Sequence, residues 1–360
     1  MLMLKKLLPL MFVACTTQAA EVVHIYNWGE YIAPDTLKNF QAATAIGTQY
    51  DVYDANETLD AKLMAGHSGY DVVFPSAHFM ANQIRSGALK KLDRSQLPNW
   101  KNLNPVLMKA LEADDPGNQY GVPYLWGTTG IGYNIDKVRA VLGKDVPLDS
   151  WDVLFKPENL AKLHQCGVAV LDNGPELLPI ALHYLGLPPH SKNPADYKKA
   201  EALLIQMRKN VTYFHSAKYI GDLANGDICM AVGWSGDIMQ AASRAKEAGN
   251  GVKVQYEIPR EGGPFWIDMM AMPADAPNAA AGYAFINYIL QPQVAADISN
   301  SVRYANGNAA ADSLVDPALK ADPTAYPPQE VMNNMFILQA MPLDIDRLRT
   351  RIWSKVKNGI

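Results

Sequence analysis

The chain lacks the short signatures that mark common catalytic and nucleotide-binding sites. Its seven histidines are scattered, and none forms HExxH or another close pair that would bind a metal. The glycine-rich stretch GTTGIG has neither the GxGxxG nor the Walker spacing, and GWSGD departs by one residue from the GxSxG nucleophile elbow. These absences leave an enzyme without a positive argument, so we expect no catalytic residue, no cofactor and no metal.

Long hydrophobic runs are also missing. No internal run reaches the ~18 to 20 apolar residues that a membrane-spanning helix needs. The first residues carry two lysines, then the short apolar stretch LLPLMFVA, then the small side chains of QAA. This pattern predicts a secretory signal peptide over residues 1–20, with an amphipathic first helix as the alternative. The stretch FVAC only loosely resembles a lipoprotein box, because Phe12 fits poorly, so a lipid anchor at Cys15 is not expected.

Cysteine is scarce. Removal of the leader leaves only Cys166 and Cys229. Two cysteines in an oxidising compartment predict one disulfide, which would stabilise the fold by about 4 kcal/mol on the chain-entropy model. Two unpaired buried thiols are the alternative.

A strong excess of either charge is absent as well. Lys plus Arg is 32 and Asp plus Glu is 36, and loss of Lys5 and Lys6 with the leader takes the formal net charge from −4 to about −6. A mildly acidic exported chain has no electrostatic basis for binding nucleic acid, whereas it is compatible with a cationic ligand.

Strand-like and helix-like segments alternate from residue 21. EVVHIYNW, TQYDVYDA and YDVVFPS predict strands, and APDTLKNFQAAT, NETLDAKLMAG and AHFMANQIRSG predict the helices that follow them. We expect Pro34 in the first turn of the first helix, and Asn56 as the N-cap of the second helix, which Gly66 ends. This alternation predicts an α/β fold with a mainly parallel sheet and helices on both faces.

Two stretches are expected to cross between separate α/β lobes. YGVPYLWGTTGIGYNI is rich in small residues, and EIPREGGPFWIDMMAMP has the pattern strand, turn, strand. We therefore expect one lobe of residues 21–126 and 258–305, and a second lobe of residues 127–257 and 306–360. The C-terminal DIDRLRTRIWSKVKNG predicts an amphipathic basic helix with a solvated face.

Aromatic residues stand beside carboxylates in several short segments. These are NWGEY (Trp28, Glu30, Tyr31), GWSGD (Trp234, Asp237), FWIDM (Trp266, Asp268), VRYANGN (Tyr304) and LDNGPEL (Asp172, Glu176). A single tryptophan is more often a core residue. However, NWGEY, PSAHF and GWSGD directly follow predicted strands, and ligands of parallel sheets bind beyond the carboxyl ends of strands. Together the segments predict a binding site.

The combination of aromatic and acidic side chains indicates the kind of ligand. Aromatic faces attract ammonium groups and pack against methylene chains, and carboxylates form charge-assisted bonds with ammonium groups. A slender aliphatic chain with an ammonium group at each end, a polyamine, satisfies both. A neutral sugar would need mixed donors such as Arg, Lys and Asn, and a metal or phosphate would not need so many tryptophans.

The same segments resemble the periplasmic putrescine/spermidine-binding proteins of ABC importers, over essentially the whole mature chain. The matching motifs are YNWGEYIAPDT, KLMAG, DVVFPSA, TTGIGYN, YIGDLANGDICMAVGWSGD and YANGNAAA. The resemblance implies a two-lobe, type II periplasmic-binding-protein fold that closes like a hinge on a ligand in the interlobe cleft. It also implies a non-enzymatic, monomeric periplasmic protein that delivers a polyamine to an inner-membrane ABC permease. An exported enzyme acting on a small amine or sugar, and a polyamine sensor, are the alternatives.

The resemblance assigns roles to particular residues. The ligand site that it implies consists of Trp28, Gly29, Glu30, Tyr31, Ser76, Glu176, Trp234, Asp237, Trp266, Asp268 and Tyr304. Trp28, Trp234 and Tyr304 look like walls of an aromatic box, and Glu176, Asp237 and Asp268 look like the principal ammonium partners. Ser76 looks like a polar contact near one amine, and Glu30 like an acid that reaches one end of the site. Cys166 and Cys229 match the family's disulfide.

A few positions depart from the family pattern. Gly29 replaces a hydroxyl residue that is common in the putrescine-type motif, and His78 and Asn173 match neither type. Trp266 and Glu30 look like those of spermidine-preferring members, where putrescine binders more often have Phe and Asp. On these two residues the sequence favours spermidine, with putrescine second.

Overall fold

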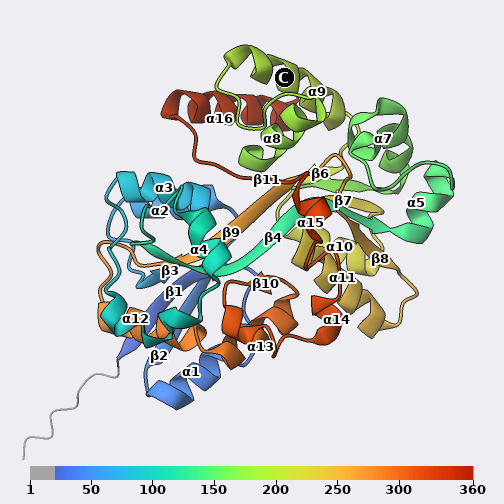
Figure 1. Cartoon of the computed structure of the whole chain (residues 1–360). Coiled ribbons are helices and arrows are strands. Elements are labelled where there is room, and N and C mark those ends of the chain that lie inside the picture. Colours follow the sequence, from blue (N-terminus) through green and yellow to red (C-terminus); the bar gives the residue numbers. More distant parts are fainter. Residues whose placement is uncertain (1–20, 360) are drawn as a thin grey trace, which may run out of the picture.

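The computed structural model describes residues 21–359, so the predicted signal peptide and Cys15 lie outside the described residues. A mixed sheet of 11 strands runs through this part of the molecule (Figure 1). The strand order is β2 (Gly47–Tyr53), β1 (Val22–Trp28), β3 (Val72–Val73), β9 (Pro264–Ala271), β4 (Gly121–Asn134), β7 (Met230–Trp234), β5 (Val168–Val170), β6 (Tyr213–Phe214). Three strands lie off this path: β8 (Val254–Glu257) and β10 (Ala305–Asn306) pair with β4, and β11 (Phe336–Ile337) pairs with β9.

Parallel pairing holds in the outer parts of the sheet, as the β-α alternation predicts. Strands β1, β2 and β3 are parallel to one another, and so are β5, β6 and β7. The two long strands in the middle, β4 and β9, pair antiparallel with each other and with their neighbours β7 and β3. The sheet is therefore mixed, because the strands between its two parallel parts carry the chain from one half of the molecule to the other.

Helices cover both parts of the sheet (Figure 1). Those around the first part are α1 (Thr36–Thr44), α2 (Asn56–Met64), α3 (Ala77–Arg85), α4 (Pro105–Leu111), α12 (Ala279–Ile289) and α13 (Pro292–Val302), with the 3₁₀ helices η1 (Arg94–Gln96) and η2 (Pro98–Asn102). Those around the second part are α5 (Ile135–Leu142), α6 (Asp152–Phe155), α7 (Pro157–Leu163), η3 (His164–Cys166), α8 (Gly174–Tyr184), α9 (Pro194–Arg208), α10 (Lys218–Asn225), α11 (Ser235–Ala248) and α16 (Leu343–Asn358). The short η4 (Ala309–Ala311), α14 (Pro317–Lys320) and α15 (Gln329–Met332) lie in the segment that leads to α16.

Two expected helix starts differ from the structure. Helix α1 begins at Thr36, so Pro34 precedes it instead of lying in its first turn. Helix α2 begins at Asn56 itself, after Ala55, and the Asn56 side chain makes no cap bond. Its amide forms hydrogen bonds with Ser76 instead, because the ends of β2 and β3 bring Asn56 next to Ser76, three residues after β3.

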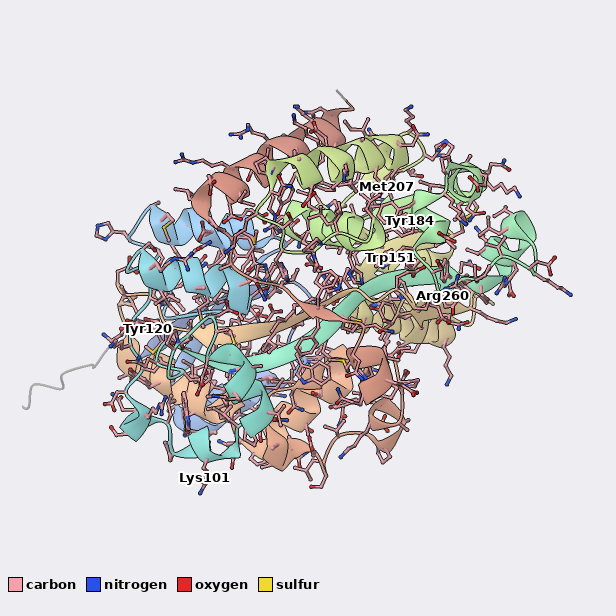
Figure 2. All side chains as sticks on the ribbon, turned by 45° about the horizontal axis from the view of Figure 1, so that its top comes forward. Lys101, Tyr120, Trp151, Tyr184, Met207 and Arg260 are labelled. Carbon is pink, nitrogen blue, oxygen red and sulfur yellow. A yellow bond between two sulfur atoms is a disulfide. The ribbon has the colours of Figure 1, made fainter. Side chains whose placement is uncertain are left out.

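The hydrophobic core is divided into two large clusters. The first draws on residues 23–125 and 266–304 together with Leu338, and the second on residues 131–256 and 341–356. We call the parts of the molecule around them lobe 1 and lobe 2. Strand β4 pairs with β9 up to Thr128 and with β7 from Thr129, so it changes partners between the two clusters. Figure 2 shows β4 and β9 running side by side through the middle of the molecule.

The C-terminal helix α16 is amphipathic, as predicted. It buries Ile345, Ile352 and Val356 beside α8 and α9 of lobe 2, and it exposes Arg347 and Arg351 to solvent. Among residues 21–359, none of the helices combines the length and the apolar character needed to cross a membrane.

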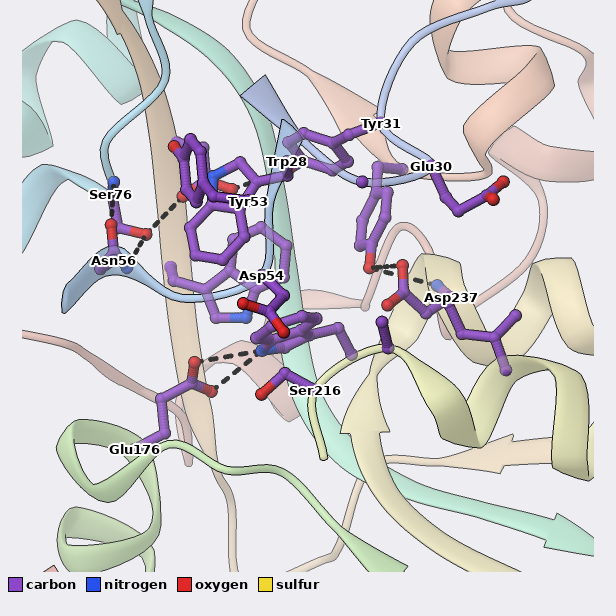
Figure 3. A pocket seen from close by; sticks show the side chains of 17 residues that line it. Trp28, Glu30, Tyr31, Tyr53, Asp54, Asn56, Ser76, Glu176, Ser216 and Asp237 are labelled. Carbon is purple, nitrogen blue, oxygen red and sulfur yellow. Dashed lines mark hydrogen bonds between the residues drawn. The ribbon is translucent and has the colours of Figure 1, made fainter. Parts of the chain in front are cut away.

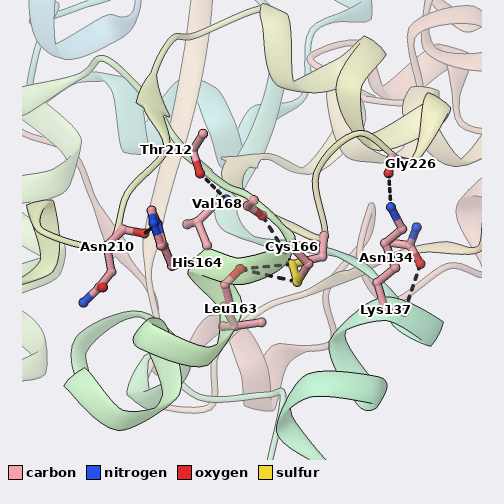
Figure 4. Close-up of a disulfide and its surroundings, with 11 residues drawn as sticks. Asn134, Lys137, Leu163, His164, Cys166, Val168, Asn210, Thr212 and Gly226 are labelled. Atoms are coloured by element: carbon pink, nitrogen blue, oxygen red, sulfur yellow. Dashed lines mark hydrogen bonds between the residues drawn. A yellow bond between two sulfur atoms is a disulfide. The ribbon is translucent and has the colours of Figure 1, made fainter.

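The predicted disulfide between Cys166 and Cys229 is present in lobe 2 (Figure 4). It links η3 to the residue before β7 across a sequence separation of 63. Because the bond restricts the unfolded chain, we expect the Cys166→Ala/Cys229→Ala variant to lose about 2–4 kcal/mol of unfolding free energy in urea titrations. Dithiothreitol should destabilise the parent by a similar amount and leave the variant unaffected. A variant as stable as the parent would contradict the prediction.

Candidate functional site

A cavity lies between the lobes, where the parallel strands of both lobes end (Figure 3). Its empty volume is about 590 Å³, including the part open to solvent. The residues that line it are Trp28, Gly29, Glu30, Tyr31, Tyr53, Asp54, Asn56, Ser76, Glu176, Ser216, Ala217, Ile220, Trp234, Asp237, Trp266, Asp268 and Tyr304. The structure thus brings together all eleven residues that the sequence suggested, from segments up to 276 positions apart.

The aromatic walls come from both lobes. Trp28 ends β1 and Trp234 ends β7, and their rings meet edge to face at 5.7 Å between centroids. Trp266 lies 5.5 Å from Tyr304 and 6.5 Å from Trp234, also edge to face. The Trp28 indole N–H donates to the Phe74 carbonyl at 2.8 Å. Since these rings hold each other at steep angles, the cavity has several apolar faces of different orientation.

Asp268 is a buried carboxylate in the lobe 1 wall. It accepts hydrogen bonds from the Tyr31 hydroxyl at 2.9 Å and the Ser76 hydroxyl at 2.6 Å, and Asn56 donates to the Ser76 hydroxyl at 2.9 Å (Figure 3). Burial raises the pKa of Asp268 to about 7, against the lowering effect of the two hydroxyl donors. With this pKa the group holds its proton part of the time near neutral pH.

Glu176 is a second buried carboxylate, in the first turn of α8 in lobe 2. It accepts from the Trp234 indole at 3.1 Å, from the Asn173 amide at 2.7 Å and from the Thr129 hydroxyl. Burial raises its pKa to about 7, although the donors Thr129 and Trp234 lower it. Asn173 does not line the cavity, but it holds Glu176 in place.

Asp237 is a third buried carboxylate, in the first turn of α11. It accepts from the Tyr304 hydroxyl at 2.7 Å and from the Tyr219 hydroxyl at 2.8 Å. Burial raises its pKa to about 6, again against the hydroxyl donors. Because Tyr304 belongs to the core of lobe 1 and Asp237 to α11 of lobe 2, this bond also joins the lobes.

Glu30 lies at the exposed edge of the cavity. Its carboxylate points away from the cavity in Figure 3 and forms an ion pair of 2.7 Å with Arg244 of α11. Both side chains are about half exposed, at 56% and 43%, so the pair contributes little stability by itself. Its position across the gap makes it a second link between the lobes.

Gly29 departs from the family pattern, although the space around it would accommodate a side chain. Its N–H donates to the Tyr53 carbonyl at 3.1 Å, and a Cβ at this position would meet nothing within 4 Å. A hydroxyl residue would therefore fit here.

Six lining residues were missed by the sequence argument. They are Tyr53, Asp54, Asn56, Ser216, Ala217 and Ile220. The first three end β2 or follow it directly, so the strand-end rule that found NWGEY could have found them. Ser216, Ala217 and Ile220 follow the two-residue strand β6, which carries no such signal.

Three residues noted in the sequence lie outside the cavity lining: Asn173, described above, Asp172 and His78. Asp172 accepts from the Trp353 indole at 2.8 Å and from Lys357 at 3.0 Å, so it ties α16 to lobe 2. His78 is buried, and burial lowers its pKa to about 3, which keeps its imidazole neutral.

The two α/β lobes, their crossing strands and the interlobe cavity define a type II periplasmic binding protein. The sequence model of the bacterial extracellular solute-binding proteins matches residues 36–327, and the chain belongs to this family.

Characterised relatives are similar over nearly their whole length. The putrescine-binding periplasmic protein SpuD of Pseudomonas aeruginosa UCBPP-PA14 is 55% identical over 349 residues, which cover 96% of this chain and 95% of SpuD. The putrescine-binding periplasmic protein PotF of Escherichia coli K12 is 52% identical, with coverage of 97% and 95%. The spermidine/putrescine-binding periplasmic protein of the same organism is 35% identical, with coverage of 87% and 85%.

Solved structures share the fold. The spermidine/putrescine ABC transporter substrate-binding protein PotD of Streptococcus pneumoniae matches with a TM-score of 0.74 at 27% identity, covering 94% of this chain and 99% of PotD. The Tp0655 (TpPotD) lipoprotein of Treponema pallidum matches with a TM-score of 0.78 at 26% identity, covering 94% and 100%.

Proposed function

We propose that this protein captures a polyamine in the interlobe cavity, in the periplasm, and delivers it to the permease of an ABC importer. The observation that carries the proposal is the convergence of three buried carboxylates and six aromatic side chains from both lobes on one cavity. The names of the similar proteins support it, since they describe putrescine or spermidine binding in the periplasm. They also favour a binding protein over the alternative of an exported enzyme.

Each part of the cavity has a role in this proposal. Asp268, Asp237 and Glu176 pair with ammonium groups, and the indoles of Trp28, Trp234 and Trp266 pack against the methylene chain and the flanks of the ammonium groups. Ser76 and Tyr31 orient Asp268, and Thr129 orients Glu176. Burying an ammonium group without such a partner would cost several kcal/mol, so the carboxylates select a ligand with matching charges.

We propose a diamine of the putrescine type as the preferred ligand, with spermidine second. The sequence favoured spermidine on Trp266 and Glu30, but two observations point the other way. The relatives of 50–55% identity are named for putrescine or for putrescine and agmatine, and spermidine appears in the names at 33–35%. The Glu30 carboxylate is also engaged by Arg244.

Calorimetric titration with putrescine, cadaverine, spermidine and spermine tests the function. We expect saturable binding to one site without turnover and a Kd between micromolar and nanomolar, about −8 to −12 kcal/mol. The matched control is 1,4-butanediol, which has the length of putrescine without its charges and should not bind. Absence of heat and of a thermal shift with every amine would rule the function out.

The hinge and the partners form part of the same proposal. We propose that residues 21–126 with 258–305 and residues 127–257 with 306–360 close on the ligand as rigid lobes, and that the protein is a monomer that binds no nucleic acid. X-ray scattering should show a more compact particle of monomer mass when putrescine is added. A dimer, or a radius that does not change, would contradict this part.

Trp266→Phe should change the order of amine affinities more than it changes stability. The indole covers a greater length of an aliphatic chain than a phenyl ring does, so we expect the affinity for spermidine to fall about tenfold relative to that for putrescine. Trp126→Phe is the control, because Trp126 lies in β4 without lining the cavity. An equal loss of affinity for every amine would show that Trp266 does not select among amines.

A further inference from the structure

Gly127 lies opposite Trp266 in the pair of crossing strands. The two residues are register partners between β4 and β9. A Cβ built at Gly127 would lie 2.9 Å from both Cη2 and Cζ2 of Trp266 and 3.0 Å from Oγ of Ser235. Real Cβ atoms are almost never found so close to other atoms. Gly127 is not among the residues of positive φ, so its backbone is one that any residue adopts. Glycine is required here because the Trp266 ring leaves no room for a Cβ.

The two atoms in contact belong to the six-membered ring of the indole. This ring is the part of a tryptophan that extends beyond the reach of a phenylalanine. A phenyl ring at position 266 would leave that space empty, and a side chain at position 127 could then occupy it. The Ser235 hydroxyl, the other near neighbour, can rotate away, whereas a rigid indole moves only as a whole.

The Trp266 indole has little freedom to move away from a new Cβ. It is 6% exposed, and its N–H donates to the Thr129 hydroxyl at 3.2 Å. Its ring meets Tyr304 at 5.5 Å. Thr129 in turn donates to Glu176, so a displaced indole would disturb an aromatic wall and the partner of a carboxylate together.

We propose that Gly127 is a specificity-determining residue of the amine site, which positions an indole at residue 266 by leaving room for its outer ring. The proposal rests on the proposed function and adds a residue that does not itself line the cavity. Gly127→Ala forces the indole off the stretch of amine chain that it covers. A longer amine depends more on that contact, so it loses more affinity than a short one.

A double-mutant cycle tests the proposal. Gly127→Ala should lower the affinity for spermidine about tenfold more than the affinity for putrescine in calorimetric titrations. In the Trp266→Phe background the same substitution should change either affinity by less than about twofold, because the ring that it meets is absent. A selective loss that persists at full size in that background would overturn the proposal.

Gly132→Ala is the matched control for strain in β4. Its Cβ would lie 2.8 Å from Cδ1 of Ile238, a core side chain outside the cavity lining. This variant should lower the midpoint of thermal unfolding and leave the order of amine affinities as in the parent. If Gly127→Ala, like Gly132→Ala, lowers the melting temperature but leaves the order of amine affinities unchanged, Gly127 has no role in specificity.

Thermal unfolding without ligand gives a second, independent readout. Gly127→Ala should lower the melting temperature of the parent, and it should lower that of the Trp266→Phe variant by much less. A loss of the same size in both backgrounds would show that the new Cβ does not meet the indole. This readout separates the two proposals: a parent that binds no amine refutes the function, whereas the thermal cycle still decides the packing.

Discussion

Asp268→Asn is expected to weaken amine binding by about 3–5 kcal/mol, a loss of more than a hundredfold in Kd. The substitution keeps the size of the side chain and removes its charge. An ammonium group in the cavity would then be buried beside an amide, and the desolvation cost of the cation would no longer be offset. The Tyr31 and Ser76 hydroxyls donate to different oxygens of Asp268, so an amide in its place would present one of them with an NH₂ group instead of an acceptor.

Asp172→Asn is the matched control for this loss. Asp172 lies four residues before Glu176, but its carboxylate binds Trp353 and Lys357 and does not line the cavity. Its substitution should leave the Kd for putrescine within about twofold of that of the parent. Calorimetric titration of both variants measures these Kd values, and circular dichroism confirms that each variant is folded. An unchanged Kd in Asp268→Asn would mean that the ligand binds elsewhere.

Amine affinity should fall steeply as the pH is lowered from about 8 to about 5.5. Burial raises the pKa of both Asp268 and Glu176 to about 7 and that of Asp237 to about 6. Below these values the carboxyls are protonated, and an incoming ammonium group must displace the proton. Each of the two groups of higher pKa should cost about thirtyfold in Kd at about pH 5.5, so together they reach about three orders of magnitude.

The effect of pH on the free energy of unfolding, measured without added amine, has the opposite sign. The folded pKa values lie above the unfolded ones, so the stabilising contribution of these groups is complete in acid and is lost as the pH rises through about 7.

Because amine binding is stronger at high pH, the thermal shift caused by putrescine should be larger at about pH 8 than at about pH 5.5. Titration in two buffers of different ionisation enthalpy should detect proton release near neutral pH. Asp268→Asn should make the pH dependence shallower; a Kd that does not vary with pH in the parent would contradict the assignment of these groups.

Much of the site could be predicted because its residues stand next to strand ends. Trp28 and Trp234 close strands β1 and β7, and Ser76 follows β3 within three residues. A strand is recognisable from a short window of sequence, and the end of a parallel strand places the next residues at one edge of the sheet. The same rule should have included Asp54 and Asn56 after β2. We assigned Asn56 to a helix cap, because its bond to Ser76 is not visible in the local sequence.

The order of the first three strands and helices, the two crossing segments and the pairing of the two cysteines followed from the chain itself, since periodicity, turn residues and composition are local properties. The hydrogen-bond or ion-pair partner of each carboxylate could not be predicted in this way. Asp172 and Glu176 lie only four residues apart, before and within the first turn of α8, yet the first binds α16 and the second faces the cavity. Glu30 meets Arg244, 214 residues away, and the pKa values of the three buried acids are raised by their burial in the folded protein. Burial and long-range contacts exist only once the chain has folded, and they separate the carboxylates that can bind a cation from those that hold the fold together.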